Sequence, residues 1–315
     1  MKYIKDIKPD EKIESVYLLK KKELKRTKEN KPYLTMVLAD KTGAIEAKVW
    51  DDADTVEMRI GGASAVHIKG VVVKYRENIQ FKVDHIRPAD ENEYSPSDLI
   101  RSLENPEEIF DKIVGYIKSI ENKWLNLLAM AILDDVDLRE KFMRSPGAQN
   151  WHNAYIGGLM EHTYEVMYIT DHVCSLYPEA SRDICLIGAF CHDIGKTVEL
   201  DPSKFEYTVQ GGLIGHLTLG FEILSRKIAG IPGFPEDLAT HLKHGILSHH
   251  GEYEQQSPVL PKTLEATIVY HADELVSQAN AIKELIQAQS GLQKVWSNFV
   301  SIKNRKYLLT KPEDL

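Results

Sequence analysis

Residues 13–86 alternate apolar and polar side chains in short runs, which is the period of half-buried β-strands. Turns with glycine at residues 40–43 and 61–62 and a tight turn at residues 76–78 separate the runs. Five short strands within about 80 residues, with a longer excursion after the third, predict a small all-β Greek-key barrel of the OB type. The runs cover residues 13–19, 33–40, 44–50, 65–75 and 78–86.

The pattern changes to the helical period after a polar boundary. Residues 87–97 hold two prolines and three acids among small polar residues, which is typical of a linker. A helix start follows at residues 105–108, because proline suits the first helical position and acids suit the first turn. The pattern then stays helical almost to residue 300. We therefore predict a multidomain chain with a barrel in residues 1–89, a linker in residues 90–105 and an all-α bundle in residues 106–315.

Composition narrows the class of protein. A length of 315 residues suits two domains, and 43% hydrophobic with 27% charged residues is ordinary for soluble proteins. No apolar run approaches the roughly 18 residues that cross a bilayer, and the N-terminus has no signal-peptide core, so no membrane partner is expected. Three cysteines, Cys174, Cys185 and Cys191, lie inside apolar helical patterns. This odd number favours reduced, buried thiols and a cytoplasmic location.

Residues with metal-seeking side chains recur in the helical half. Imidazole and carboxylate together suit a divalent metal such as Mn, Fe, Co, Ni or Zn. Two polar residues at the end of the apolar run 183–191, His192 and Asp193, would be costly to bury without partners. A set this large is too big for one metal with open positions and suits two metals for attack at phosphorus. The set, in chain order, is His162, His192, Asp193, His216, His249, His250 and Asp273. Taken singly, a histidine such as His216 would more often be a core residue bonded to a carbonyl group.

The order of these residues resembles that of the HD-domain phosphohydrolase superfamily, with Gly195 and Lys196 after the His-Asp pair. The additional His216 and the pair His249-His250 resemble its two-metal phosphodiesterase branch. Residues 31–35, 38–51 and 157–163 further resemble YhaM-type 3′→5′ exoribonucleases, which pair an OB-fold with an HD domain over this whole length. The resemblance implies an HD-type domain in residues 106–315, with its core at about residues 150–285.

The resemblance also implies roles for individual residues. His162, His192, Asp193 and Asp273 should bind one metal, and Asp193 should bridge to a second metal on His216 and His249. His250 is the alternative second-metal ligand or a phosphate contact. A water between the metals would attack phosphorus, while Lys196 would stabilise the developing charge unless it is only a solvated residue at a helix end. His152 is expected to contact the substrate phosphate or supply a further ligand. Manganese is expected, although Co, Ni, Fe or Zn fit the same ligands.

The barrel is expected to grip nucleic acid. Residues 1–89 carry a net charge of +5, whereas the remaining residues carry −13, although such clustering also arises by chance. OB-type folds stack bases on aromatic side chains within a basic groove. The aromatic candidates are Tyr33, Trp50, Tyr75 and Phe81, of which Phe81 and Trp50 could instead fill the barrel core. The phosphate-binding candidates are Lys20, Lys21, Lys25, Arg26, Lys28, Lys48, Lys74 and Arg76.

The leading hypothesis is a 3′→5′ exonuclease acting on single-stranded RNA, and also on single-stranded DNA. A second hypothesis is a phosphohydrolase for small nucleotides with the barrel as a regulatory module. Residues 251–254 lack the Gly-Tyr-Pro signature of the cyclic-dinucleotide branch. A third is an RNA-binding adaptor with an inactive HD fold, against which the complete ligand set argues. Processivity, physiological target and a homo-oligomeric state stay open.

Overall fold

The structure is a computed structural model that describes residues 1–75, 78–148, 153–202, 206–289, 295–297, 299–300 and 304–309. The chain divides into two compact units, Met1–Ser102 and Leu103–Leu315, so that the division falls within the predicted linker.

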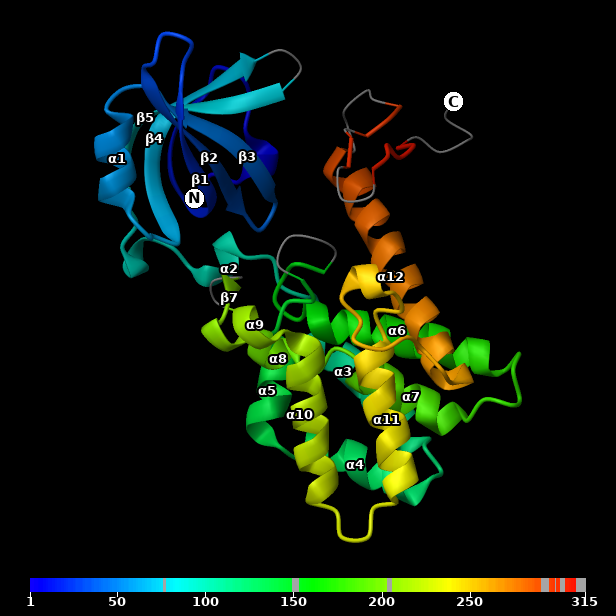
Figure 1. Cartoon of the computed structure of the whole chain (residues 1–315). Helices are drawn as coiled ribbons and strands as arrows, with labels where there is room; N and C mark the ends of the chain where they lie inside the picture. The colour runs from blue at the N-terminus through cyan, green and yellow to red at the C-terminus, as the bar shows by residue number, and fades with distance from the viewer. Residues whose placement is uncertain are drawn as a thin grey trace. The chain divides into compact units, whose positions relative to one another are not determined.

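The first unit is a closed five-stranded barrel with the strand order β1-β2-β3-β5-β4 (Figure 1). All strand pairs are antiparallel except β3 with β5, which are parallel. The excursion after the third strand holds helix α1. This arrangement confirms the predicted OB-type barrel. Its elements are η1 (Ile4–Asp6), β1 (Lys12–Arg26), β2 (Pro32–Asp40), β3 (Gly43–Val49), α1 (Ala53–Ile60), β4 (Ala65–Tyr75), β5 (Asn78–Pro88), η2 (Glu91–Glu93) and α2 (Pro96–Leu99).

Alternation along the strands fills the barrel core. Leu34, Met36 and Leu38 of β2 are fully buried, and the rings of Tyr17 and Phe81 lie 5.9 Å apart in the interior. Phe81 is thus a core residue, which was the alternative to nucleic-acid contact. The first strand is longer than predicted and runs through the basic stretch, because residues up to Arg26 keep pairing with β2.

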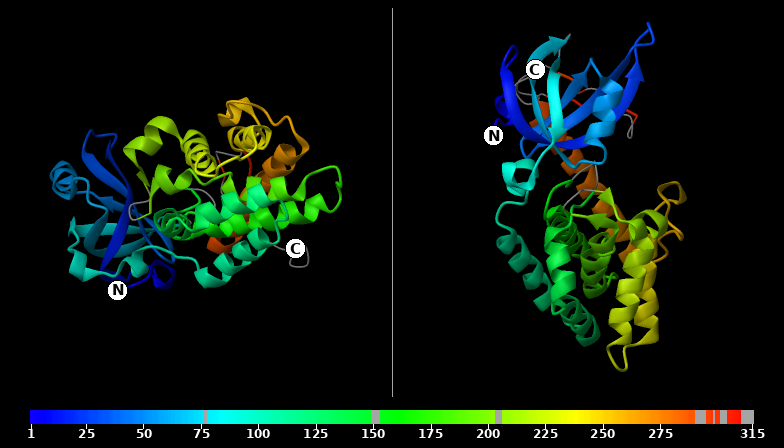
Figure 2. Two further views of the ribbon diagram at one scale, coloured as in Figure 1. Left: turned by 90° about the horizontal axis from the view of Figure 1, so that it is seen from below. Right: turned by 90° about the vertical axis from the view of Figure 1, so that its left-hand side faces the viewer.

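The second unit is a helical bundle. Helix α6 packs against α7 and α12, and α10 and α11 pack side by side as a hairpin (Figures 1 and 2). One apolar core, which includes Leu128, Met160, Phe190 and Ile246, joins these helices. The elements are α3 (Pro106–Lys118), α4 (Lys123–Leu133), α5 (Val136–Arg144), α6 (Gly158–Cys174), α7 (Arg182–Cys191), α8 (Lys196–Glu199), β6 (Leu200–Asp201), β7 (Glu206–Tyr207), α9 (Val209–Ile214), α10 (His216–Ala229), α11 (Glu236–Ser248), η3 (Tyr253–Gln255) and α12 (Leu264–Gln289).

One local prediction in this unit was wrong. A two-stranded hairpin, β6–β7, interrupts the helical pattern, because Leu200 and Asp201 pair with Tyr207 and Glu206. The last helix, α12, runs to Gln289. Lys196 begins α8 and does not close the preceding helix, which ends at Cys191. None of the helices in the described ranges is both long enough and apolar enough to cross a membrane.

Replacement of Phe81 by alanine should destabilise the barrel by about 3–5 kcal/mol, because it removes a fully buried aromatic ring and leaves a cavity. Replacement of Trp50 by alanine should destabilise the barrel far less, because this side chain is 37% exposed. Hydrogen exchange of barrel peptides in the full chain measures both effects. Equal losses of protection in the two variants would contradict the assignment of Phe81 to the core and Trp50 to the surface.

Candidate metal centre

One group of buried polar side chains lies where the end of α7 packs against α6. His162, His192 and Asp193 each offer a ligand atom, and these atoms lie within 4.8 Å of one another. Nε2 of His162 is 3.2 Å from Nε2 of His192 and 3.1 Å from Oδ1 of Asp273, which α12 supplies. The structure thus brings together the four residues that the sequence predicted for the first metal.

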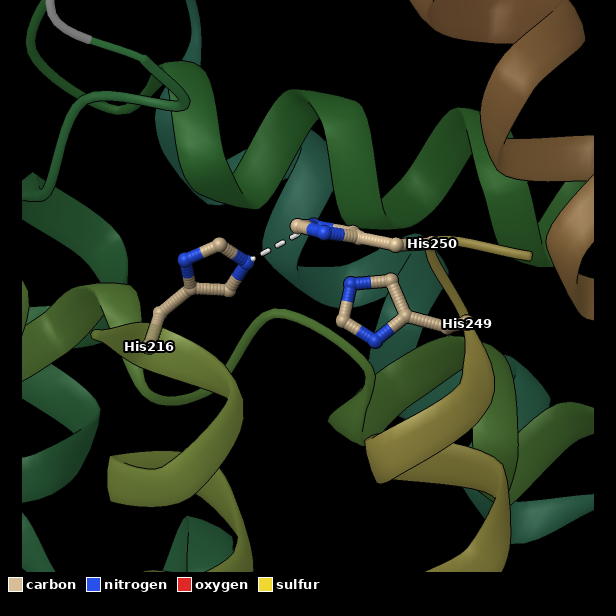
Figure 3. Close-up of side chains that lie close together, drawn as sticks. All are labelled: His216, His249 and His250. Atoms are coloured by element: carbon tan, nitrogen blue, oxygen red, sulfur yellow. Dashed lines mark hydrogen bonds between the residues drawn. The ribbon is translucent and has the colours of Figure 1, made fainter. Parts of the chain in front are cut away.

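A second group contains three histidines from two helices. His216 begins α10, while His249 and His250 directly follow α11 (Figure 3). Their ligand atoms also lie within 4.8 Å of one another, and Nε2 of His216 is 3.1 Å from Nε2 of His250. The sequence left a choice between His249 and His250, and the structure places both rings in this group.

The carboxylate of Asp193 faces both groups. Its Oδ2 is 3.3 Å from Nε2 of His192 and 3.7 Å from Nε2 of His162. Its Oδ1 is 3.5 Å from Nε2 of His216 and 3.5 Å from Nε2 of His249. One buried side chain therefore presents one oxygen to each group of imidazoles, which is the arrangement that a bridging ligand requires.

The Nδ1 atoms of these histidine rings make hydrogen bonds that turn the Nε2 atoms toward the Asp193 carboxylate. Nδ1 of His192, His249 and His250 donates to the carbonyl oxygens of Ala189, Ile246 and Gln255, at 2.7, 2.8 and 2.7 Å. A carbonyl oxygen only accepts, so in the neutral ring Nδ1 carries the proton and Nε2 is left with a bare lone pair. Nδ1 of His216 likewise donates to a carboxylate oxygen of Glu199, so the Nε2 atoms of His216 and His250 meet as two acceptors, a contact that a cation between them would make favourable.

Charge and burial in the centre also fit a divalent cation. Among the described residues, buried Oδ1 of Asp193 and Nε2 of His249 make no hydrogen bond, although burying such atoms unpaired is costly. Burial lowers the pKa of His249, and burial with the neighbouring His249 and His216 lowers the pKa of His250 to about 3. These rings are thus neutral and able to bind metal at ordinary pH.

Lys196 makes an ion pair with the central carboxylate. Its Nζ is 2.6 Å from Oδ2 of Asp193. Burial alone would raise the pKa of Asp193, but the positive charge of Lys196 outweighs this effect and holds the pKa well below its usual range. Burial alone would lower the pKa of Lys196. The negative charge of Asp193 outweighs this effect and raises the pKa. The alternative of a solvated lysine at a helix C-terminus is therefore wrong.

Sequence reasoning missed Glu199, the last residue of α8. Its largely buried Oε1 accepts from the backbone N of His216 at 2.9 Å and from its Nδ1 at 3.0 Å. Two glycines permit this approach: a Cβ on Gly195 would lie 2.0 Å from the carbonyl oxygen of His216, and one on Gly211 would lie 2.2 Å from that of Glu199. Glu199 therefore fixes the ring of His216, and a single glutamate in a short helix gave no sequence signal for it.

A pocket of about 490 Å³ opens beside the second group of histidines. Lys196, Glu199, His216 and His250 line it, together with apolar residues that include Tyr207. It is large enough for a small organic ligand. The pocket shows that side chains of the centre are reachable from solvent.

The barrel presents an aromatic and cationic surface of its own. The rings of Tyr33 and Trp50 stack with centroids 4.9 Å apart and planes at 16°. Nζ of Lys48 lies 6.0 Å from the centroid of Trp50 and 5.2 Å from that of Tyr75. Tyr75 is 54% exposed, and the exposure of Trp50 shows that it does not fill the core.

The predicted basic residues of the barrel are mostly on its surface. Lys21, Arg26, Lys28 and Lys74 are exposed, and Lys25 is half-buried beside Glu23, at 3.2 Å. Arg76 in the barrel and His152 in the helical unit lie outside the described residues.

Three other histidines of the helical unit, His241, His244 and His271, lie outside both groups. Nε2 of His241 is 3.2 Å from Glu265, and Nε2 of His244 accepts from the backbone N of Lys262 at 3.0 Å. His271 lines an apolar groove with Tyr177. None of these three side chains belongs to either group of candidate metal ligands.

Each of the two units matches a known protein family. The model described as "HD domain" matches residues 159–277, and the model described as "OB-fold nucleic acid binding domain" matches residues 19–89. A solution structure of the second OB-fold domain of replication protein A from Methanococcus maripaludis covers 29% of this chain and 95% of its own, at 17% identity and a TM-score of 0.24. The barrel assignment rests on the strand order and the family match, not on this structure.

Curated relatives span most of the chain. The 3′-5′ exoribonuclease YhaM of Listeria welshimeri is 34% identical over 281 residues, 86% of this chain and 87% of the relative. The protein of the same name from Bacillus velezensis is 33% identical over 268 residues, 84% of each chain. Fold, site and matches define an HD-domain protein with an OB-fold nucleic-acid-binding domain. Within that class, the chain belongs to the YhaM family of 3′-5′ exoribonucleases, which confirms the resemblance seen in its sequence.

Two substitutions of Glu199 should weaken metal binding to different extents. Glu199→Gln keeps an acceptor for His216 but removes the charge that makes its ring more basic, and Glu199→Ala removes both. Loss of such a partner typically costs about 10- to 100-fold in metal affinity, so we expect the alanine variant to lose more than the glutamine variant. Calorimetric titration with Mn²⁺ measures this, with exposed Glu222→Gln on α10 as the control. Unchanged affinity in Glu199→Ala would refute the positioning role.

Proposed function

We propose that this protein hydrolyses phosphodiester bonds from the 3′ end of single-stranded RNA, with single-stranded DNA as a second substrate. The observation that carries the proposal is the placement of Asp193 between two groups of metal-seeking side chains. The curated relatives, named 3′-5′ exoribonucleases, support RNA as the substrate. Three buried free thiols support the expected cytoplasmic location.

Two divalent metal ions are the cofactors that this donor set supports. Nitrogen and oxygen donors in this mixture suit Mn, Fe, Co, Ni or Zn, and Mn is our first choice. When bound, the pair would lower the pKa of water and neutralise phosphate charge. His162, His192, Asp193 and Asp273 would hold one ion, and His216, His249 and His250 would hold the other with Asp193 as the shared ligand.

The protein groups around the phosphate have separate tasks. Lys196 lines the pocket, and its raised pKa keeps it protonated, so it supplies positive charge to a non-bridging phosphate oxygen. Glu199 holds the ring of His216 with Nε2 toward Asp193. The carbonyl groups of Ala189, Ile246 and Gln255 hold the rings of His192, His249 and His250 in the same manner. These fixed orientations spare the reaction the cost of ordering the centre at each turnover.

The barrel would hold the strand. The stacked pair Tyr33–Trp50, with Lys48 near Trp50 and Tyr75, combines the aromatic and cationic groups that bind single strands. Each base has a π face and each nucleotide a phosphate, so this surface favours single-stranded polymer without selecting a sequence.

Asp193→Ala should abolish shortening of a 5′-labelled single-stranded RNA in the presence of Mn²⁺. We expect a loss of more than about 100-fold, because the variant removes a ligand and not only a partner of one. Gel analysis of a time course with the wild-type protein should show a ladder that shortens from the 3′ end. Removal of metal with a chelator should stop it, and added Mn²⁺ should restore it.

Two further variants make this test specific. Asp193→Asn keeps the volume of the side chain and should be as inactive as Asp193→Ala, while exposed Asp237→Ala on α11 should behave like the wild type. Intact RNA with the wild-type protein and Mn²⁺, together with hydrolysis of nucleoside triphosphates or cyclic nucleotides, would replace the proposal by the small-nucleotide alternative.

Trp50→Ala should weaken binding of a single-stranded oligonucleotide without impairing the hydrolytic centre. Loss of one stacked base is worth roughly 1–3 kcal/mol, or about 5- to 150-fold in affinity. Fluorescence anisotropy in an Asp193→Asn background measures binding without degradation, and hydrolysis of bis(4-nitrophenyl) phosphate by Trp50→Ala reports the centre. The control is Met58→Ala on α1, where the side chain is 72% exposed. Equal affinities of Trp50→Ala and Met58→Ala would exclude this surface as the strand-binding site.

A further inference from the structure

The pocket beside the histidines has an apolar wall that the proposed chemistry does not use. Tyr207 and Ile214 line the same pocket as Lys196, His216 and His250. The side chains of both are open to solvent, with Tyr207 53% and Ile214 41% exposed. A large aromatic surface left in water beside charged groups is typical of a ligand-binding position.

The position of Tyr207 is fixed relative to the centre by short connections. Tyr207 pairs with Leu200 in the β6–β7 hairpin, and Leu200 directly follows Glu199. The next residue, Thr208, donates from its backbone N to the carbonyl oxygen of Glu199 at 3.0 Å and from its Oγ1 to that of Val198 at 2.9 Å. The backbone that carries the tyrosine ring is therefore bonded to the segment that holds His216.

The chemistry of the pocket identifies its occupant. A phosphodiester at Lys196, His216 and His250 carries a nucleoside, and a nucleoside presents a flat base that gains about 1–3 kcal/mol from stacking on an aromatic ring. Exposed apolar residues continue beyond Ile214 along α9, where Val209 and Leu213 are more than 80% exposed. An aromatic and apolar wall next to a phosphate-binding wall matches the two halves of one nucleotide.

We infer that Tyr207 stacks on the base of the 3′-terminal nucleotide, with Ile214 at the edge of the same subsite. The inference rests on the proposed function and adds to it the residue that recognises the end of the strand. Because every base has a π face, the subsite accepts all four nucleotides. An abasic end would lose the contact entirely.

The test compares two RNAs that differ only at the 3′ end, one with a normal terminal nucleotide and one with an abasic ribose. The rate of the first cleavage is measured under single-turnover conditions with Mn²⁺ for wild type, Tyr207→Ala and Tyr207→Phe. We expect Tyr207→Ala to slow removal of the normal nucleotide by about 5- to 150-fold and to leave the abasic rate nearly unchanged. Tyr207→Phe keeps the ring and should match the wild type on both RNAs.

Tyr177→Ala is the matched control, because Tyr177 is similarly exposed, at 47%, and lines a separate apolar groove. If the wild-type protein is active and Tyr207→Ala slows both RNAs equally, or slows neither, the subsite is overturned while the proposed function stands. A wild-type protein that shortens neither RNA would overturn the proposed function and the subsite together.

Discussion

Burial of the Asp193 carboxylate among imidazoles is the constraint on which the helical unit depends. A carboxylate removed from water costs several kcal/mol unless it is paired, and Lys196 supplies that pairing from one side. The ring nitrogens around it come from α6, from α10 and from the residues that directly follow α7 and α11. Each of these helices must therefore reach the same point, and the shared apolar core of the bundle holds them there. The core serves the chemistry by fixing ligand positions that no single helix could fix.

The features with a local physical cause were predictable from the sequence. Strand alternation gave the barrel, and the cost of ending an apolar helix with His192 and Asp193 gave the centre. Strand alternation also predicts that Trp50 lies on the barrel surface. Successive side chains point to opposite faces of a strand, and the preceding residue, Val49, faces the core. Glu199 could not be found this way, because its partnership with His216 depends on close packing at Gly195 and Gly211. The β6–β7 hairpin was missed for a similar reason, as two-residue strands carry no periodic signal.

The proposed recognition and the proposed chemistry would use different kinds of side chain in this protein. The aromatic rings of Trp50 and Tyr207 are exposed and would need only an unstacked base, whereas His192 and His249 are each oriented by a hydrogen bond to a backbone carbonyl and Asp193 by its ion pair with Lys196. On this proposal the protein would select a substrate by whether its bases are free to stack, and base identity would matter little. A paired strand would first have to be opened, at a cost of a few kcal/mol per nucleotide.

The opposed lone pairs of His216 and His250 have a consequence for folding. Bare acceptors 3.1 Å apart are unfavourable in the native state and are relieved only by positive charge between them. A metal that binds the native state and not the unfolded chain adds RT ln(1 + [L]/Kd) to the free energy of unfolding, about 2.7 kcal/mol at a hundredfold excess over Kd. The abundance of folded protein in a cell would then depend on the supply of metal. When metal is scarce, a larger unfolded fraction would be degraded, so the protein would be lost together with its activity.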